Sequence, residues 1–292
     1  MRTYNSNTWK PSHHQHQHSD TLDYPEGLTN YLKPRWLQVD AESLQTESWN
    51  LVDRRVQKLL DKIKAAGKPL GEYVKGNIFY GIKTGLNEAF VIDAASRARL
   101  IPEDPNSAEI NKPFLAGRDI KRYQQPVKDK YLLFTRRGII IENYSAVLKH
   151  LEQYRERLEP KLKNYTGREW TGRKEGTYKW YEIQDAVIYY EEFEKPEIML
   201  PDISIRAEAL YDITGNYCVN TAYIIPIEER HLTAILNFKV SLYFYASLSS
   251  TTSGGYFRFI RRYMEQIPIP KMLKENEERT HSGLSGPGYY QC

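Results

Sequence analysis

Cysteine and long apolar runs are the scarcest features of this sequence. Only 2 of the 292 residues are cysteine, Cys218 and Cys292, and they lie far apart, which argues against a disulfide scaffold and against zinc ligation by cysteine. No apolar run is long enough to span a bilayer, and residues 1–20 are too polar for a secretory signal. We therefore expect a cytoplasmic protein with no membrane partner.

The motifs of several enzyme classes are also missing. The sequence has no Gly-rich phosphate loop, no G-x-S-x-G and no zinc deaminase or metalloprotease signature. The Lys-Thr-Gly at 83–85 lacks the companion motifs of penicillin-binding enzymes. Asp202 and Glu208 resemble the acids of a metal-dependent nuclease, but Leu210 stands where such a site needs lysine, and Asp after Pro is typical of a turn. The histidine run at 13–18 is interpreted as incidental, so no catalytic residue and no metal site are expected.

Positive charge is unevenly distributed. The totals nearly balance, with 41 Lys and Arg against 37 Asp and Glu, but residues 115–181 hold a clear basic excess. Many of the 23 tyrosines lie in the same basic stretches. Cations interleaved with rings suit a nucleic acid, whose phosphates attract the charge and whose bases stack on the rings. The alternative is that tyrosine merely covers sheet surfaces.

Five basic segments are the candidates for DNA contact. Asp119 lies among three cations and could orient an arginine for bidentate contact with guanine, although a simple surface ion pair is the alternative. The loop at 161–181 could enter a groove, or be a solvated loop with one anchored tryptophan. Residues 83–84 and 136–137 lie at expected hairpin turns, and 251–263 combines hydroxyls, glycines and arginines. The predicted DNA-binding residues are Lys83, Thr84, Arg118, Lys121, Arg122, Arg136, Arg137, Arg168, Arg173, Lys174, Ser253, Arg258 and Arg261.

The expected elements cluster by type, which favours an α+β fold over a doubly wound sheet. Apolar spacing predicts helices at 48–66, at 145–163 with Ser145 as N-cap, and at 228–249. Alternation predicts hairpins of 78–80 with 88–92 and of 131–134 with 138–141, strands at 187–194, 197–200 and 217–225, and a loop at 167–176. The expected organisation is a disordered leader at 1–30, a connector with an amphipathic helix at 31–67, a recognition domain at 68–271 and a disordered tail at 272–292.

Several blocks follow one another in a distinctive order. They lie at 81–93, 112–123, 151–170, 193–198, 232–245, 254–259 and 267–270, and they begin with Gly-Ile-Lys-Thr-Gly-Leu-Asn and Lys-Pro-Phe-Leu-Ala-Gly-Arg-Asp. This order resembles the TaqI-like C-terminal specificity domain of adenine-specific DNA methyltransferases and type II restriction-modification enzymes. The resemblance runs from about residue 68 to residue 271 and implies a mixed β-sheet target-recognition domain with a few packed helices, preceded by a connector helix.

In that family the domain grips double-stranded DNA and delivers an adenine by base flipping to a methyltransferase domain that uses S-adenosyl-L-methionine. This sequence has no Pro-Pro dipeptide, and therefore no Asn-Pro-Pro-Tyr catalytic motif. The resemblance thus implies a sequence-specific DNA-recognition module without its catalytic domain and without a cofactor of its own. Two alternatives remain: a subunit that acts in trans on a separate methyltransferase or nuclease subunit, and a non-functional fragment.

Overall fold

The structure is a computed structural model that describes residues 53–271, apart from residues 125, 128, 250 and 252, together with residue 30. The histidine run, the expected tail and the rest of the expected leader lie outside the described residues. Two compact units make up the chain: unit 1 combines Met1–Pro69 with Pro268–Cys292, and unit 2 is Leu70–Ile267. The functional limits expected at 68 and 271 stay a prediction, because packing alone does not define a recognition domain.

Unit 1 contains one helix and a short strand pair among its described residues. Helix α2 is Arg54–Ala65, and the Asp53 side chain caps its start by accepting a hydrogen bond from the Arg55 backbone N–H at 2.7 Å. Strands β1 (Gly67–Pro69) and β12 (Pro268–Pro270) pair in antiparallel fashion. The amphipathic helix expected at 48–66 is therefore confirmed over its described part.

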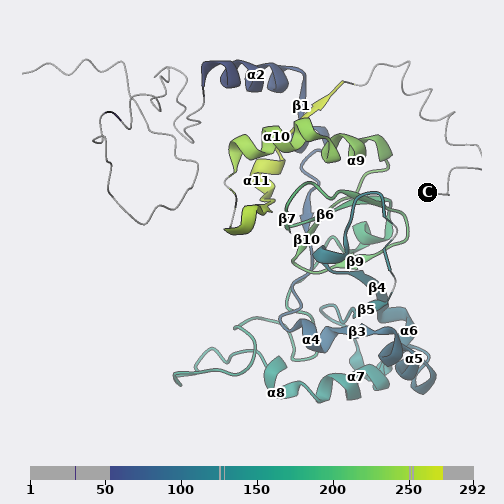
Figure 1. Cartoon of the computed structure of the whole chain (residues 1–292). Coiled ribbons are helices and arrows are strands. Elements are labelled where there is room, and N and C mark those ends of the chain that lie inside the picture. The colour runs from purple at the N-terminus through teal and green to yellow at the C-terminus, as the bar shows by residue number, and fades with distance from the viewer. Residues whose placement is uncertain are drawn as a thin grey trace, which may run out of the picture. The chain divides into compact units, whose positions relative to one another are not determined.

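Unit 2 is built on two four-stranded sheets (Figure 1). The first has the order β2 (Phe79–Tyr80), β10 (Ala222–Ile225), β6 (Glu197–Pro201), β8 (Leu210–Asp212), and all its pairs are antiparallel. The second has the order β3 (Val91–Asp93), β5 (Lys130–Leu133), β4 (Asn111–Leu115), β9 (Tyr217–Cys218), and only β4 and β9 are parallel. A further pair joins β7 (Ile203–Ser204) to β11 (Phe257–Arg258).

Helices accompany each sheet, which confirms the α+β class. Beside the first sheet lie α9 (Arg230–Asn237), α10 (Lys239–Leu248) and α11 (Arg261–Met264), with α3 (Leu70–Tyr73) near the start of the unit. Beside the second lie α4 (Asn87–Phe90), α5 (Ala94–Glu103), α6 (Ser107–Ile110), α7 (Ser145–Glu152) and α8 (Arg155–Leu158). Short 3₁₀ turns are η3 (Gly117–Asp119), η4 (Ile141–Asn143), η5 (Tyr190–Glu194) and η6 (Ser253–Gly255).

Two of the passages of the chain between the sheets, after β2 and after β9, lie side by side. Strand β9 of the second sheet continues through residues 219–221 into β10 of the first. Strand β2 is followed by Ile82, which forms a parallel bridge with Val219. Both residues are buried, at 0% and 2% exposure, and belong to one continuous apolar core. The turn after Ile82, where DNA contacts are expected, is therefore anchored at the junction of the sheets.

Neither expected hairpin forms. Strand β2 pairs with β10, and residues 87–90 are helix α4, whose Ala89 and Phe90 are fully buried. The Thr84 hydroxyl accepts a hydrogen bond from the Leu86 backbone N–H at 3.2 Å and donates to Asn87 at 2.7 Å, which turns the chain into α4 rather than into a strand. Strand β5 lies between β3 and β4, while residues 138–141 form no strand.

Other expected elements are broken or of another type. The helix expected at 145–163 is split into α7 and α8, and Ser145 is not its cap, because its hydroxyl donates to Asp104 at 3.3 Å. The strand expected at 187–194 contains the 3₁₀ turn η5, and the one at 217–225 is divided into β9 and β10. The helix at 228–249 is interrupted at the extended residue Phe238. The strand at 197–200 and the loop at 167–176 are confirmed.

Candidate nucleic-acid interface

Arg118 lies in the 3₁₀ turn η3, directly after strand β4, and its side chain is 80% exposed. Asp119 was expected to orient it, but the Asp119 carboxylate accepts a hydrogen bond from Lys130 at 2.9 Å, whereas the Arg118 Nε lies 3.8 Å away. The Ala116 backbone N–H also donates to Asp119, at 3.2 Å. The carboxylate therefore shapes the turn, and the Arg118 guanidinium extends into solvent.

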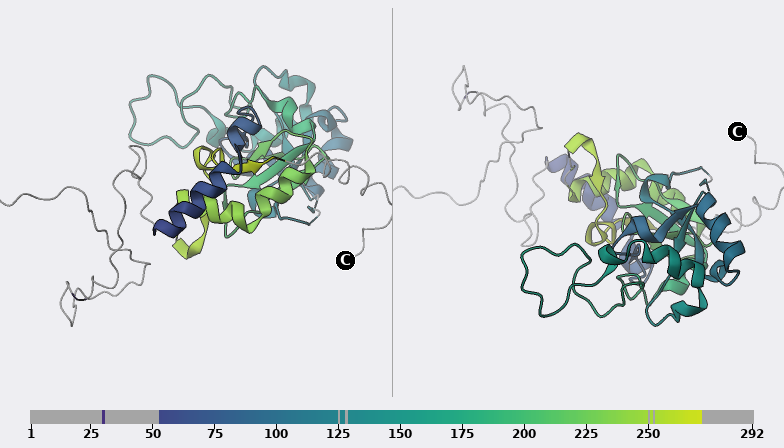
Figure 2. Two further views of the ribbon diagram at one scale, coloured as in Figure 1. Left: turned by 90° about the horizontal axis from the view of Figure 1, so that it is seen from above. Right: turned by 90° about the horizontal axis from the view of Figure 1, so that it is seen from below.

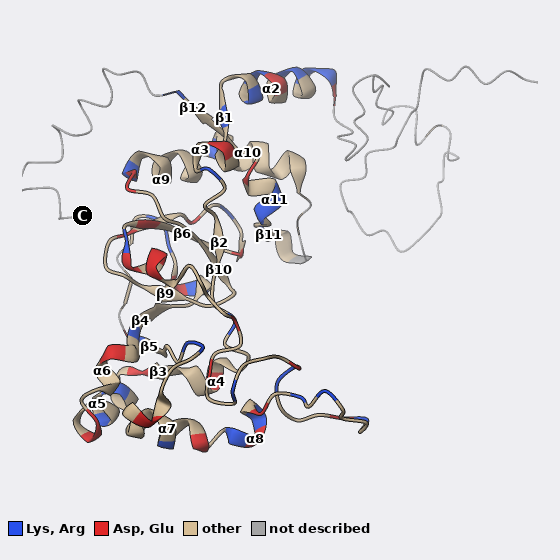
Figure 3. Ribbon diagram, turned by 180° about the vertical axis from the view of Figure 1, so that it is seen from behind, with Lys and Arg blue, Asp and Glu red and all other residues tan. Residues whose placement is uncertain are grey.

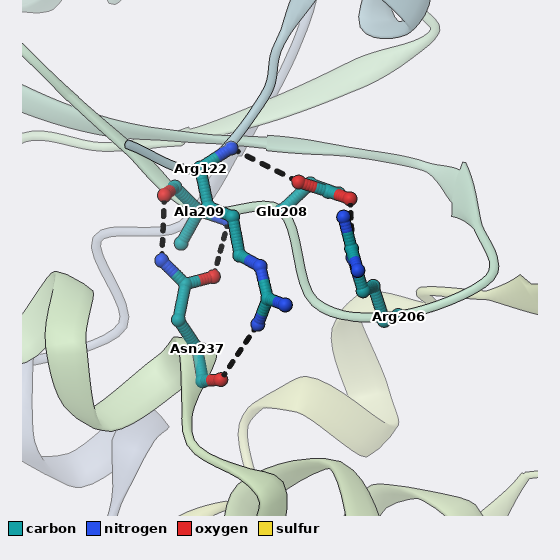
Figure 4. A network of polar contacts seen from close by, with 5 residues as sticks. All are labelled: Arg122, Arg206, Glu208, Ala209 and Asn237. Carbon is teal, nitrogen blue, oxygen red and sulfur yellow. Dashed lines mark hydrogen bonds and ion pairs between the residues drawn. The ribbon is translucent and has the colours of Figure 1, made fainter. Parts of the chain in front are cut away.

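Arg122 is held by a polar network that joins three segments (Figure 4). Its backbone N–H donates to the Glu208 carboxylate at 3.0 Å, and its Nη1 lies 3.5 Å from the Asn237 carbonyl at the end of α9. The Arg206 Nε donates to Glu208 at 2.8 Å, and the Asn237 side chain bonds both the N–H and the carbonyl of Ala209 at 2.8 Å. This network fixes the path of the chain at 122, next to the exposed Lys121.

Glu208 is the negative centre of this network. Its side chain is 6% exposed, while that of Arg206 is 54% exposed. Burial disfavours the charged carboxylate, but the hydrogen bonds from Arg122 and Arg206 outweigh it and lower the pKa of Glu208. Lys121 adds to the same effect. One buried anion thus binds the Arg206 side chain, attracts Lys121 and holds the backbone at Arg122. Arg206 was missed by the sequence reasoning because no motif marks it.

Residues 161–172, which we name the finger, form a loop between α8 and Arg173. Its base is closed by two backbone hydrogen bonds, from Arg173 N–H to the Glu159 carbonyl at 2.9 Å and from Lys161 N–H to the Arg173 carbonyl at 3.0 Å. Figures 1 and 2 show it as a long excursion beside α8. The Tyr165 and Trp170 rings meet edge to face with centroids 4.9 Å apart. The exposed Arg168 lies between these two rings in the sequence.

Arg173 is not at the surface, so this structure does not offer its side chain for the predicted contact with DNA. The residue is 4% exposed. Its guanidinium has five N–H donors, and all of them reach backbone carbonyls, those of Leu158, Thr84, Glu182, Lys179 and Trp180, at 2.7 to 3.1 Å. Burial lowers the pKa of Arg173 to about 10, so the group is still charged near neutral pH. We name this set of contacts the Arg173 clamp.

Lys83 and Thr84, the predicted pair at the first turn, also differ in the exposure of their side chains. Lys83 is exposed, and its backbone exchanges hydrogen bonds with Asp185. Thr84 is 1% exposed, and its hydroxyl is used inside the turn. Burial and internal hydrogen bonds leave the Thr84 hydroxyl no open face in this structure, and its contact with DNA stays a prediction.

Arg136 and Arg137 also differ in exposure and in their contacts. Arg136 is exposed, with its guanidinium 4.9 Å from the centre of the Tyr190 ring. Arg137 is half-buried and donates to Thr177 at 2.6 Å and to the Gln184 carbonyl at 2.7 Å. Both line a surface pocket of about 520 Å³. Arg136 is thus available to a phosphate, whereas Arg137 fastens the segment after the finger.

The segment at 258–262 presents further arginines. Arg258 lies on β11, and Arg261 begins α11, where it donates to Glu265 at 2.7 Å and to the Gly76 carbonyl at 3.0 Å. Both side chains are exposed, as is that of Arg262. Ser253 lies in η6, but its side chain is outside the described residues. Figure 3 shows that α11, α8 and the finger bring their basic residues to one side of unit 2.

The acids that resemble a nuclease site do not form one. Asp202 accepts a hydrogen bond from the Tyr80 hydroxyl at 2.8 Å, and Glu208 is engaged with Arg122 and Arg206. Within the described part of the chain there is no group of three or more His, Cys, Asp or Glu residues that could hold a metal ion. In the same part, each helix is too short or too polar to cross a bilayer.

Comparison with known proteins identifies relatives of this fold. A family model described as a TaqI-like C-terminal specificity domain matches residues 112–269. The type II methyltransferase M.PaeR7I of Pseudomonas aeruginosa is 24% identical over 232 residues, which is 77% of this chain and 37% of that protein. The type II methyltransferase M.XhoI of Xanthomonas vasicola is 30% identical over 100 residues, 33% of this chain and 18% of that protein. The chain thus spans only a minor part of the length of either relative.

Two solved structures are more distantly similar. The type IIL restriction-modification enzyme MmeI in complex with DNA has a TM-score of 0.42 at 15% identity, over 63% of this chain and 23% of that one. The type IIG restriction endonuclease BpuSI has a TM-score of 0.41 at 12% identity, over 85% of this chain and 30% of that one.

Proposed function

Since this chain belongs to the family of TaqI-like C-terminal specificity domains, we propose that it recognises a particular sequence in double-stranded DNA within a restriction-modification system. The match over residues 112–269 carries the proposal. That range contains the η3 turn, the finger and the segment at 258–262, which are the places where basic side chains are exposed. The names of the two methyltransferase relatives support the same role.

The exposed cations can be assigned to two kinds of contact with DNA. Contacts to phosphate position a protein on the duplex, and contacts to base edges specify the sequence. Arg258 and Arg261 lie on short elements and Arg136 lies against the Tyr190 ring, and all three suit the first kind of contact. Arg118 and Arg168 lie on a turn and a loop that extend beyond their neighbours and suit the second. The major groove admits a two-stranded ribbon, and the finger has two limbs joined at their base.

We assign methyl transfer to a catalytic domain outside this sequence. The chain has no Asn-Pro-Pro-Tyr motif and no Gly-containing loop of the kind that the family's catalytic domain uses for S-adenosyl-L-methionine, so its residues do not fit that cofactor. The catalytic domain could be carried by the same polypeptide or by a separate methyltransferase subunit that this chain serves in trans. Either arrangement acts on DNA in the cytoplasm.

The decisive experiment is a selection of bound duplexes from a random library at moderate salt. We expect enrichment of one short motif, because base-edge contacts add discrimination to the sequence-blind attraction of phosphate. Binding that depends on salt but not on sequence would refute the proposed role. Adding S-adenosyl-L-methionine to this chain and the selected duplex should give no methylation, and methylation by this chain alone would refute the assignment of catalysis to another domain.

A further inference from the structure

The Arg173 clamp connects two stretches that are distant in the sequence. One carbonyl that it binds belongs to Thr84, in the turn that carries Lys83, and another belongs to Leu158, at the end of α8. Backbone hydrogen bonds run alongside, from Gln184 N–H to the Thr84 carbonyl at 3.2 Å and from Asp185 N–H to the Lys83 carbonyl at 3.0 Å. The base of the finger and the first turn are therefore one connected structure.

The clamp also fits its surroundings closely. The Arg173 guanidinium lies 4.4 Å from the centre of the Tyr178 ring and 5.7 Å from that of Phe90. A Cβ at Gly85 would lie 2.5 Å from the Arg173 Cδ and 2.9 Å from the Gln184 Oε1. Gly85 also has a φ of +86°, which favours glycine. Glycine at this position therefore leaves the space through which the arginine side chain passes.

The contacts of the finger itself are local. None of the residues 161–172 lies in a helix or strand. The finger is held by the Tyr165–Trp170 ring contact and by hydrogen bonds from the Trp170 indole to the Glu159 carbonyl at 3.3 Å and from the Tyr165 hydroxyl to the Glu169 carbonyl. A loop that is ordered only on binding loses conformational entropy at that moment, which lowers the affinity for DNA and the discrimination between sequences. Five charge-assisted hydrogen bonds at the base reduce this loss before DNA arrives.

We propose that Arg173 is a positioning residue for DNA reading: it does not touch DNA, but fixes the direction in which the finger leaves the fold and the register between the finger and Lys83. This inference rests on the proposed function. It places the discriminating contacts on the exposed finger residues and makes the buried arginine responsible for their alignment. A duplex-DNA groove is the surface that the aligned finger would enter.

The first test replaces Arg173 by Lys, which keeps the positive charge but has a single nitrogen in place of a planar fork. Two quantities are measured on the whole chain: trypsin cleavage within residues 161–172 without DNA, and the affinity for the selected duplex relative to a scrambled one. We expect cleavage to rise about tenfold and discrimination to fall about tenfold or more, while affinity for the scrambled duplex changes by less than about twofold. The matched control is Arg99→Lys, at an exposed position of α5 outside the candidate segments, which should leave both quantities unchanged.

A second variant disturbs the Arg173 clamp through Gly85 instead of through Arg173. It tests the proposal if R173K does not fold. Gly85→Ala places a methyl group against the arginine stem, and Gly138→Ala is its control, because Gly138 has a φ of +79° but no atom within 4 Å of an added Cβ. We expect G85A to reproduce the loss of discrimination and G138A to retain it. The double variant R173K/G85A should lose less than the sum of the two single losses, since both act on one contact.

The outcomes separate the two proposals. If R173K or G85A loosens the finger but discrimination is unchanged, the positioning role is wrong while DNA recognition stands. If R173K lowers both affinities by the same factor, the residue is merely structural and the inference also fails. If Arg168→Ala lowers discrimination while cleavage after Lys161 and Lys163 is unchanged, the finger reads DNA as inferred. A wild-type chain that binds every duplex equally would overturn the proposed function, and this inference with it.

Discussion

Arg118 offers a direct test of base reading at the scale of one residue. Its guanidinium is exposed and no carboxylate holds it closer than 3.8 Å, so it is free to donate two parallel hydrogen bonds to a guanine edge. Arg118→Ala should then cost about 1 to 3 kcal/mol of binding free energy on the selected duplex and little on duplexes already altered at the base pair it reads. Affinities for a set of single-base substitutions measure this.

A uniform loss across that set would show that Arg118 contacts phosphate instead. No loss on any duplex would exclude Arg118 from the interface. Arg55→Ala is the matched control, because Arg55 is similarly exposed, at 95%, but lies in α2 outside the matched range of 112–269. We expect this control to leave the binding profile unchanged.

A second residue-scale prediction concerns a buried acid. Glu197 on β6 is fully buried, and neither of its carboxyl oxygens has a hydrogen-bond partner among the described residues. Burial, with the nearby charge of Asp212, raises the pKa of Glu197 from 4.5 to about 9. Between these values the folded chain keeps a proton that the unfolded chain releases, so rising pH destabilises the fold by at most about 1.4 kcal/mol per pH unit.

Glu197→Gln removes this titration. The variant should therefore exceed the wild type in free energy of unfolding by an amount that is small near pH 5 and grows toward pH 8.5. Urea unfolding at three pH values within that range measures the difference. A difference that is the same at every pH would contradict the interpretation of Glu197 as a neutral buried acid.

Arg168 and Arg173 show where residue-level reasoning from sequence stops. Both lie in the same basic, aromatic loop, and no feature of their neighbours distinguishes them. In the structure one is exposed and the other is buried, because carbonyls from a turn 89 positions earlier in the chain converge on Arg173. Such convergence depends on the tertiary fold. The sequence could therefore predict a basic surface here, but not that Arg168 is exposed at that surface and Arg173 is buried.

At the scale of elements, Tyr245 joins α10 to the arginine segment. Its ring is fully buried and stacks on Phe259 with centroids 4.7 Å apart. Its hydroxyl donates to the Arg258 carbonyl at 2.5 Å and accepts from the Ile260 N–H at 2.8 Å. Tyr245→Phe should lower the free energy of unfolding by about 1 kcal/mol, because the partly buried Arg258 carbonyl and Ile260 N–H lose their hydrogen bonds to the hydroxyl.

Chemical denaturation of Y245F measures this loss. Tyr243→Phe is the control: Tyr243 lies on the same helix but is 42% exposed, and its variant should be close to the wild type. Equal stability of Y245F and the wild type would contradict the role of the hydroxyl. We also expect Y245F to weaken DNA binding only modestly, since its effect on Arg258 and Arg261 is indirect.

The elements that the sequence could predict are those whose pattern is local. Buried residues spaced along 228–249 gave the helical character of α9 and α10, and the apolar run at 197–200 gave β6. The hairpins failed because β2 pairs with β10 and β5 with both β3 and β4, which are choices between partners distant in the sequence. The 3₁₀ turn η5 has alternating rings and acids that imitate a strand.

At the scale of the whole molecule, salt should reveal how many cations meet phosphate. Each neutralised phosphate contributes about −0.9 to the slope of log K against log salt concentration. Replacing Arg136 and Arg258 together by Ala should reduce the magnitude of that slope by up to about 2 on scrambled duplex. Titrations at four salt concentrations measure it. An unchanged slope would place both residues away from the phosphates, and R54Q/R55Q in α2 is the control.

The first and last residues of unit 2 lie side by side, which has a consequence for how a new DNA specificity could arise. The Leu70 N–H donates to the Ile267 carbonyl at 2.8 Å, so the first and last residues of the unit are adjacent, and β1 pairs with β12 just outside it. A segment whose entry and exit are neighbours can be removed and replaced without rerouting the chain around it. Exchange of the segment between Leu70 and Ile267 with that of a relative should therefore leave the rest of the chain in place, and under the proposed function it should carry the DNA target with it.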